Sequence, residues 1–79
     1  MKARIYITLR AGVLDPQGKA VVASLKTLGF DEVNDARIGK FIELELDGAP
    51  REAAIERIGK MCEKLLANTV IENYRIEVD

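Results

Sequence analysis

The chain has 79 residues, with 12 Lys plus Arg against 13 Asp plus Glu and a formal net charge of −1. It contains no His and one Cys, Cys62, which excludes zinc fingers, an internal disulfide framework and Cys–His or Ser–His nucleophiles. The near-neutral charge gives no electrostatic reason to expect a nucleic-acid or membrane partner. These counts predict a single small domain, residues 1–79, without catalytic chemistry of its own.

A domain of this size has little margin of stability, because the entropy of ordering the chain roughly offsets what so small a core contributes. No disulfide or metal site is available to add to it, so we expect association with other chains, as a homo-oligomer (dimer or tetramer) or as a subunit. The N-terminus alternates apolar and polar residues where a signal peptide needs a continuous apolar run, and apolar stretches are too short to span a membrane. We therefore expect a cytoplasmic protein.

The first element expected is a strand over Lys2–Arg10, in which apolar and polar residues alternate. Asp15 is a typical N-cap and Pro16 a typical first helical residue, so a helix begins there. The helical spacing of Val and Leu continues to Leu28, and Gly29 is a typical stop.

The middle of the chain predicts two strands joined by a tight turn. Glu32–Ile38 is a short, poorly alternating strand, Gly39-Lys40 supplies the turn, and Phe41–Leu46 alternates again. The turn at residues 47–50 then leads into a second helix that begins at Pro50.

The second helix is expected to end near Ala67, and the last strand covers Glu72–Val78. The buried stripe expected on that helix consists of Ile55, Ile58, Cys62 and Leu65. The element order β-α-β-β-α-β predicts an α+β, ferredoxin-like fold. Its four-stranded antiparallel sheet has the order 4-1-3-2, with both helices on one face.

Two helices on one face leave the other face of the sheet free. Its expected central residues are Arg4, Tyr6 and Thr8 from the first strand and Phe41 and Glu43 from the third. This face is either a solvated surface with weak cross-strand ion pairs or an interface with aromatic anchors, and we favour the interface. RNA-binding domains of this topology stack bases on such aromatics, but acidic residues on the third strand disfavour that interpretation.

The loop before the first helix precedes a helix N-terminus, which is a possible anion site. It lacks the glycine spacing and the Gly-Lys-Ser/Thr ending of a phosphate-binding loop, and Asp15 occupies the cap. A structural cap is therefore favoured over a ligand site. Cys62 is interpreted as a small core residue rather than a nucleophile, because no activating partner accompanies it.

Four segments together resemble the PurS family, the small subunit of bacterial and archaeal phosphoribosylformylglycinamidine synthase. They are GVLDPQGKA at residues 12–20, LGF at 28–30, RIGK at 37–40 and MCEKLLAN at 61–68. The resemblance covers nearly the whole chain. Thr69 stands where the family commonly has Pro, and Leu9-Arg10-Ala11 replaces a lead-in with Pro and Lys. Both departures concern local backbone rigidity only.

The resemblance implies a non-catalytic assembly subunit in de novo purine synthesis. The enzyme converts formylglycinamide ribonucleotide, glutamine and ATP to formylglycinamidine ribonucleotide, glutamate, ADP and phosphate. A PurL-type subunit holds ATP and Mg²⁺, a PurQ-type subunit releases ammonia from glutamine, and the PurS-type subunit self-associates and joins the two. No cofactor is expected on this chain. The alternative is a small-molecule-sensing regulatory module of the same topology, which ligand binding by the isolated chain would identify.

The segments expected to contact partner subunits are the first loop and the expected turn. The loop residues are Gly12, Val13, Leu14, Asp15, Pro16, Gln17 and Gly18, and the turn residues are Arg37, Gly39 and Lys40. Whether the chain adjusts the glutaminase rate or only positions that subunit is left open by the sequence.

Overall fold

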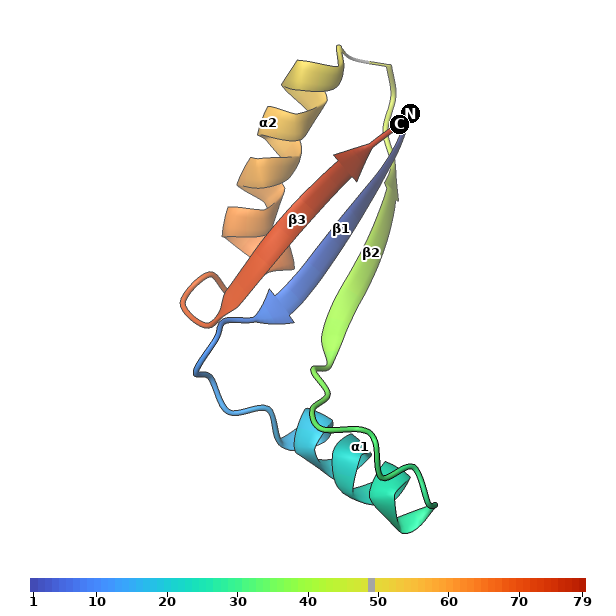
Figure 1. The fold of residues 1–79 in the computed structure, drawn as a ribbon. Coiled ribbons are helices and arrows are strands. Elements are labelled where there is room, and N and C mark those ends of the chain that lie inside the picture. Colours follow the sequence, from blue (N-terminus) through green and yellow to red (C-terminus); the bar gives the residue numbers. More distant parts are fainter. Residues whose placement is uncertain (49) are drawn as a thin grey trace.

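The computed structural model describes residues 1–48 and 50–79 and shows one three-stranded sheet and two main helices (Figure 1). In chain order the elements are β1 (Lys2–Leu9), α1 (Pro16–Thr27), β2 (Gly39–Glu45), α2 (Arg51–Met61), the π-helical turn η1 (Cys62–Leu66) and β3 (Glu72–Val78). The turn expected before α2 includes Ala49, which lies outside the described residues. No described helix is long and apolar enough to cross a membrane.

The sheet is antiparallel with the order β2-β1-β3, so the expected four-stranded sheet of order 4-1-3-2 is wrong. The three strands that form have the expected neighbours, but Glu32–Ile38 forms no strand. Two of its backbone N–H groups donate to side chains rather than to a neighbouring strand. Asp35 accepts a hydrogen bond from the Ala36 N–H, and Asp15 accepts one from the Ile38 N–H. Gly39 and Lys40 begin β2 rather than forming a hairpin turn.

The core lies between one face of the sheet and α2 with η1, and this face is called the helical face below. Alternation places every second residue of each strand there, as expected for a half-covered sheet. The buried apolar residues of this core are Ala3, Ile5, Ile7, Ala54, Ile58, Cys62, Ala67 and Val78. Ile42, Leu44 and Leu46 of the β2 side are only half-buried, because α2 packs toward β3 and leaves β2 uncovered.

The end of the second helix is wound as a π-helix, which changes the expected buried stripe. The Ala67 N–H donates to the Cys62 carbonyl five residues earlier, at 3.0 Å. This wider turn points Leu66 toward the core and leaves Leu65 82% exposed. Leu65 was therefore wrongly expected in the stripe, whereas Ile58 and Cys62 are fully buried as predicted.

α1 does not lie on the sheet, so the expectation of two helices on one face is also wrong. Figure 1 shows it projecting from the end of the sheet opposite the chain termini. Its sole buried residue is Gly18. The molecule is consequently long and thin, 48 × 24 × 14 Å, with a radius of gyration of 16.0 Å against about 12 Å for a compact chain of this length.

Candidate interaction surfaces

The junction between the sheet and α1, called the elbow below, is built around the carboxylate of Asp15. Its Oδ1 accepts from the Gly18 N–H at 2.8 Å, and its Oδ2 accepts from the Ile38 N–H at 2.9 Å. The first bond is the predicted N-cap, and Pro16 follows it at the first helical position. The second bond ties the start of α1 to the approach to β2, so one side chain fixes both connections.

Arg37 holds the other side of the elbow. Its guanidinium donates to the carbonyl oxygens of Leu9 at 3.2 Å, Arg10 at 3.1 Å and Val13 at 3.4 Å. The structure thus brings together the two segments expected to contact partners, residues 12–18 and 37–40. They line a shared cleft of about 370 Å³, together with Leu9 and Glu72. The contact with partners stays a prediction.

The two backbone hydrogen bonds, that to Ile38 first and that to Gly18 second, lower the pKa of the Asp15 carboxyl below its ordinary value. A carboxyl with a lower pKa in the folded state stabilises the fold above its unfolded pKa of about 3.9, and this stabilisation is lost as the pH falls through the folded pKa.

We expect Asp15→Asn, which keeps one carbonyl oxygen for two donors, to lower the urea midpoint at pH 7 and to flatten its fall between pH 5 and pH 2. Asp31→Asn, at an exposed position, is the control and should keep the acid limb of the parent. An unchanged acid limb in Asp15→Asn would show that the elbow does not depend on this carboxylate.

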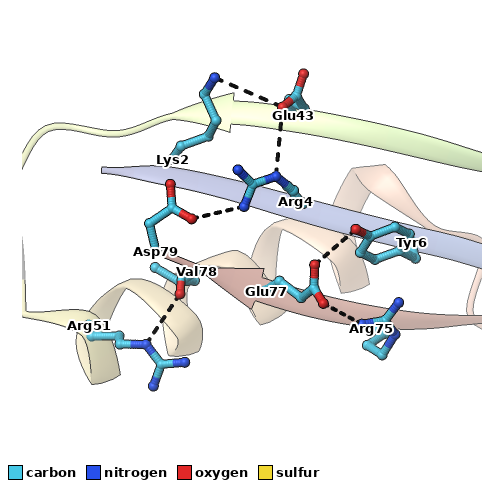
Figure 2. Close-up of polar contacts among 9 residues, drawn as sticks. All are labelled: Lys2, Arg4, Tyr6, Glu43, Arg51, Arg75, Glu77, Val78 and Asp79. Carbon is cyan, nitrogen blue, oxygen red and sulfur yellow. Dashed lines mark hydrogen bonds and ion pairs between the residues drawn. The ribbon is translucent and has the colours of Figure 1, made fainter.

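The face of the sheet opposite α2, called the open face below, carries an aromatic centre. Tyr6 lies opposite both Phe41 and Arg75 in the strand register. The Tyr6 and Phe41 ring centroids are 5.1 Å apart, and the Arg75 guanidinium carbon lies 4.1 Å from the centre of the Tyr6 ring. Figure 2 shows the Tyr6 hydroxyl donating to Glu77 at 2.9 Å, with Arg75 on the other Glu77 oxygen at 2.8 Å.

Ion pairs surround this centre and leave the open face close to neutral. Arg4 pairs with Asp79 at 2.9 Å and lies 3.9 Å from Glu43, which also lies 4.0 Å from Lys2 (Figure 2). The hydrogen bond from Arg4 lowers the pKa of the Asp79 carboxyl, and that from Tyr6 lowers the pKa of Glu77. These charges have partners of opposite sign within the chain. Phe41, which is 54% exposed, is therefore the main apolar side chain that this face leaves in water.

The predicted open-face residues Arg4, Tyr6, Thr8, Phe41 and Glu43 therefore do share one surface. Sequence reasoning missed Asp79, whose position after the last strand gave no signal. The stacking of Arg75 on Tyr6 was also missed, although alternation along Glu72–Val78 is enough to put Arg75 on this face. The signal that could have found it was the pairing of first and last strands.

The remaining candidate chemistry is weak. Cys62 is fully buried, and burial raises the pKa of its thiol, which disfavours the reactive thiolate. Within residues 1–48 and 50–79, no three acidic or cysteine side chains are grouped so that they could hold a metal ion. The exposed surfaces, rather than a catalytic pocket, are thus the features with functional potential.

Comparison with known proteins bears on these surfaces. The family model described as PurS, phosphoribosylformylglycinamidine (FGAM) synthase, matches residues 2–79. The chain belongs to the PurS family. It is 53% identical over 75 residues to a phosphoribosylformylglycinamidine synthase subunit PurS of Synechocystis, covering 95% of this chain and 75% of the relative.

Two solved structures place the fold in the same family. B. subtilis PurS is 49% identical, with a TM-score of 0.87 over 99% of this chain and 96% of that chain. A chain in the structure of PurLQS from Thermotoga maritima is 36% identical, with a TM-score of 0.88 over 96% of this chain and 93% of that one. The predicted resemblance to PurS is confirmed, and with it the assignment to a subunit of phosphoribosylformylglycinamidine synthase.

Proposed function

We propose that this chain is the assembly subunit that joins the ATP-dependent synthase subunit to the glutaminase subunit and supports ammonia transfer between them. The observation that carries the proposal is the separation of the two exposed surfaces that are candidates for contact with partners. The open face and the elbow lie on different parts of a 48 Å molecule, so one chain can touch more than one partner. The likeness to a chain within PurLQS of T. maritima supports this role.

The chemistry is assigned to the partners. ATP and Mg²⁺ belong to the PurL-type subunit and glutamine to the PurQ-type subunit, while this chain contributes position and shape. A site of action in the cytoplasm follows from that assignment. The single Cys62, buried and apart from any activating group, is a packing residue in this scheme.

Mixing tests the assembly role directly. Cognate PurL-type and PurQ-type subunits with this chain should show glutamine-dependent amidation, and leaving the chain out should abolish it. Ammonia-dependent amidation by the PurL-type subunit alone is the control and should persist, because that reaction needs no transfer. Equal glutamine-dependent activity and equal co-sedimentation of the two large subunits without this chain would overturn the proposal.

The open face is proposed as a contact between copies of the chain. Replacing Phe41 by Ala removes the most exposed part of the aromatic centre, and Tyr6→Ala removes the ring that Arg75 covers. We expect either change to weaken self-association about tenfold or more, measured by sedimentation against concentration, with little loss of stability. Glu56→Ala on the exposed side of α2 is the control. An unchanged oligomer in both variants would exclude this face as the contact.

A further inference from the structure

We propose that η1 is a conformational switch with two registers. In the observed register its π-helical winding packs Leu66 against the core, and in the second register an α-helical winding packs Leu65 there instead. Lys40, at the start of β2, holds the observed register. This inference goes beyond the assembly role and does not depend on it.

The two leucines at the end of the second helix can replace one another. An α-helix with 3.6 residues per turn places Leu65 on the same stripe as Ile58 and Cys62, both fully buried. In the π-helical turn that forms, Leu66 packs against the core cluster and Leu65 is 82% exposed. Because both residues are Leu, the apolar burial lost in one register is regained in the other. The side chains therefore leave the two registers close in free energy.

The backbone of η1 converts between the registers by moving one hydrogen bond. The Ala67 N–H donates to the Cys62 carbonyl at 3.0 Å, which is the five-residue spacing of a π-helix. In an α-helix the same carbonyl accepts from the Leu66 N–H, four residues on. Conversion thus passes one residue from the turn into the loop that leads to β3. Single π-helical turns within α-helices are rare and are found mostly at functional sites.

Lys40 ties the end of η1 to the sheet. It lies opposite Ile7 in the strand register, which places its side chain on the helical face. Its Nζ donates to the Leu66 carbonyl at 3.3 Å and lies 3.7 Å from Glu72 Oε1. The same Glu72 oxygen accepts from the Asn68 N–H at 2.7 Å. A change of winding rotates the Leu66 carbonyl about the helix axis, so these contacts favour the observed register.

The residue that holds the register also belongs to the elbow. Lys40 follows Ile38 by two residues, and the Ile38 N–H is held by Asp15 at 2.9 Å. Lys40 lines the elbow cleft as well. A group that binds in the cleft and draws the Lys40 ammonium away from η1 therefore favours the second register, in which Leu66 is exposed in place of Leu65. The elbow and the end of the second helix are coupled in this way.

A double-mutant cycle tests the switch by urea unfolding at pH 7 and a fixed protein concentration. Gln is polar and forms helices about as well as Leu, so Leu65→Gln and Leu66→Gln change mainly the apolar contact. Leu65→Gln should leave the urea midpoint unchanged. Leu66→Gln should lower it by no more than about 0.5 M, because Leu65 takes the vacated place. The double variant should lower it by more than about 1 M, well beyond the sum of the two single changes.

A fixed π-helical turn gives a different pattern. Leu66→Gln alone would then lose as much stability as the double variant, and this result would overturn the switch. A double variant that loses only the sum of the two single losses would overturn it too. If the double variant does not fold, the single variants decide, since only the switch allows Leu66→Gln to keep nearly the stability of the parent.

Methyl NMR of chains with both leucines intact tests the role of Lys40. In the parent, cross-relaxation with the methyl groups of the core cluster should be stronger for Leu66 than for Leu65. Lys40→Met removes the ammonium and keeps the aliphatic stem, and should raise the share of Leu65 in these contacts at least about threefold. Lys19→Met, at an exposed position of α1, is the matched control and should leave the shares unchanged. Equal shares in the parent and in Lys40→Met would show that Lys40 does not hold the register.

Discussion

Replacing Ile58 by Ala is expected to lower the free energy of unfolding by about 2–5 kcal/mol, the range for an aliphatic residue lost from a packed core. Ile58 is fully buried on the side of α2 that faces the sheet, in the same cluster as Ile5, Ile7 and Cys62. The buried cluster of this chain is small, so neighbours have few ways to fill the space left behind. Urea unfolding at pH 7, at a fixed protein concentration, measures the loss.

Ile55→Ala is the matched control for this change. Ile55 belongs to the same helix, and its replacement by Ala deletes the same atoms, but its side chain is only half-buried at the edge of the core. Ile55→Ala should lower the free energy of unfolding by at most about half as much as Ile58→Ala, because the deleted surface is already partly in water. Equal losses of stability for the two variants would contradict the placement of Ile58 in the centre of the core and of Ile55 at its edge.

Two Gly→Ala changes in helices should have opposite signs. Gly18 packs so closely against the segment that connects α1 to β2 that an added Cβ would overlap the carbonyl oxygen of Ala36. Gly59, in the middle of α2, has nothing within 4 Å of such a Cβ. We expect Gly18→Ala to destabilise by about 1–3 kcal/mol through overpacking and Gly59→Ala to stabilise by about 0.5–1 kcal/mol through helix propensity.

The same urea titration measures both variants, and each serves as the control for the other. Helix propensity alone would make both changes stabilising, so the sign at Gly18 reports the elbow contact. If Gly18→Ala is also stabilising, the segment around Ala36 is not held against α1 as the structure shows.

The strands and caps of this fold could be predicted from local patterns. Alternation placed Ile5 and Ile7 on one face and Tyr6 on the other, and Asp15-Pro16 marked the N-cap and first residue of α1 correctly. The strand expected at Glu32–Ile38 failed because its alternation was poor and because the distant side chain of Asp15 holds its backbone. The predicted burial of Leu65 was wrong because helical periodicity assumes 3.6 residues per turn, and η1 is wound more widely.

The position of α1 could not be predicted for a different reason. Its Val and Leu residues give the same helical pattern whether the helix covers its own sheet or that of another chain. The choice between them depends on Arg37 and on the second bond of Asp15, to Ile38, whose partners are distant backbone groups without a sequence signal. The open-face residues were brought together as predicted, since cross-strand pairing follows from alternation and strand order.

The central position of β1 has a consequence for how the chain is made. β1 is synthesised first, and its two neighbours are β2 and, last of all, β3 at Glu72–Val78. Until β3 has been synthesised, one edge of the central strand has no partner and exposes its backbone groups. We therefore expect the sheet to close, and subunit assembly to follow, only once β3 has emerged from the ribosome, with the nascent chain most prone to aggregate just before that point.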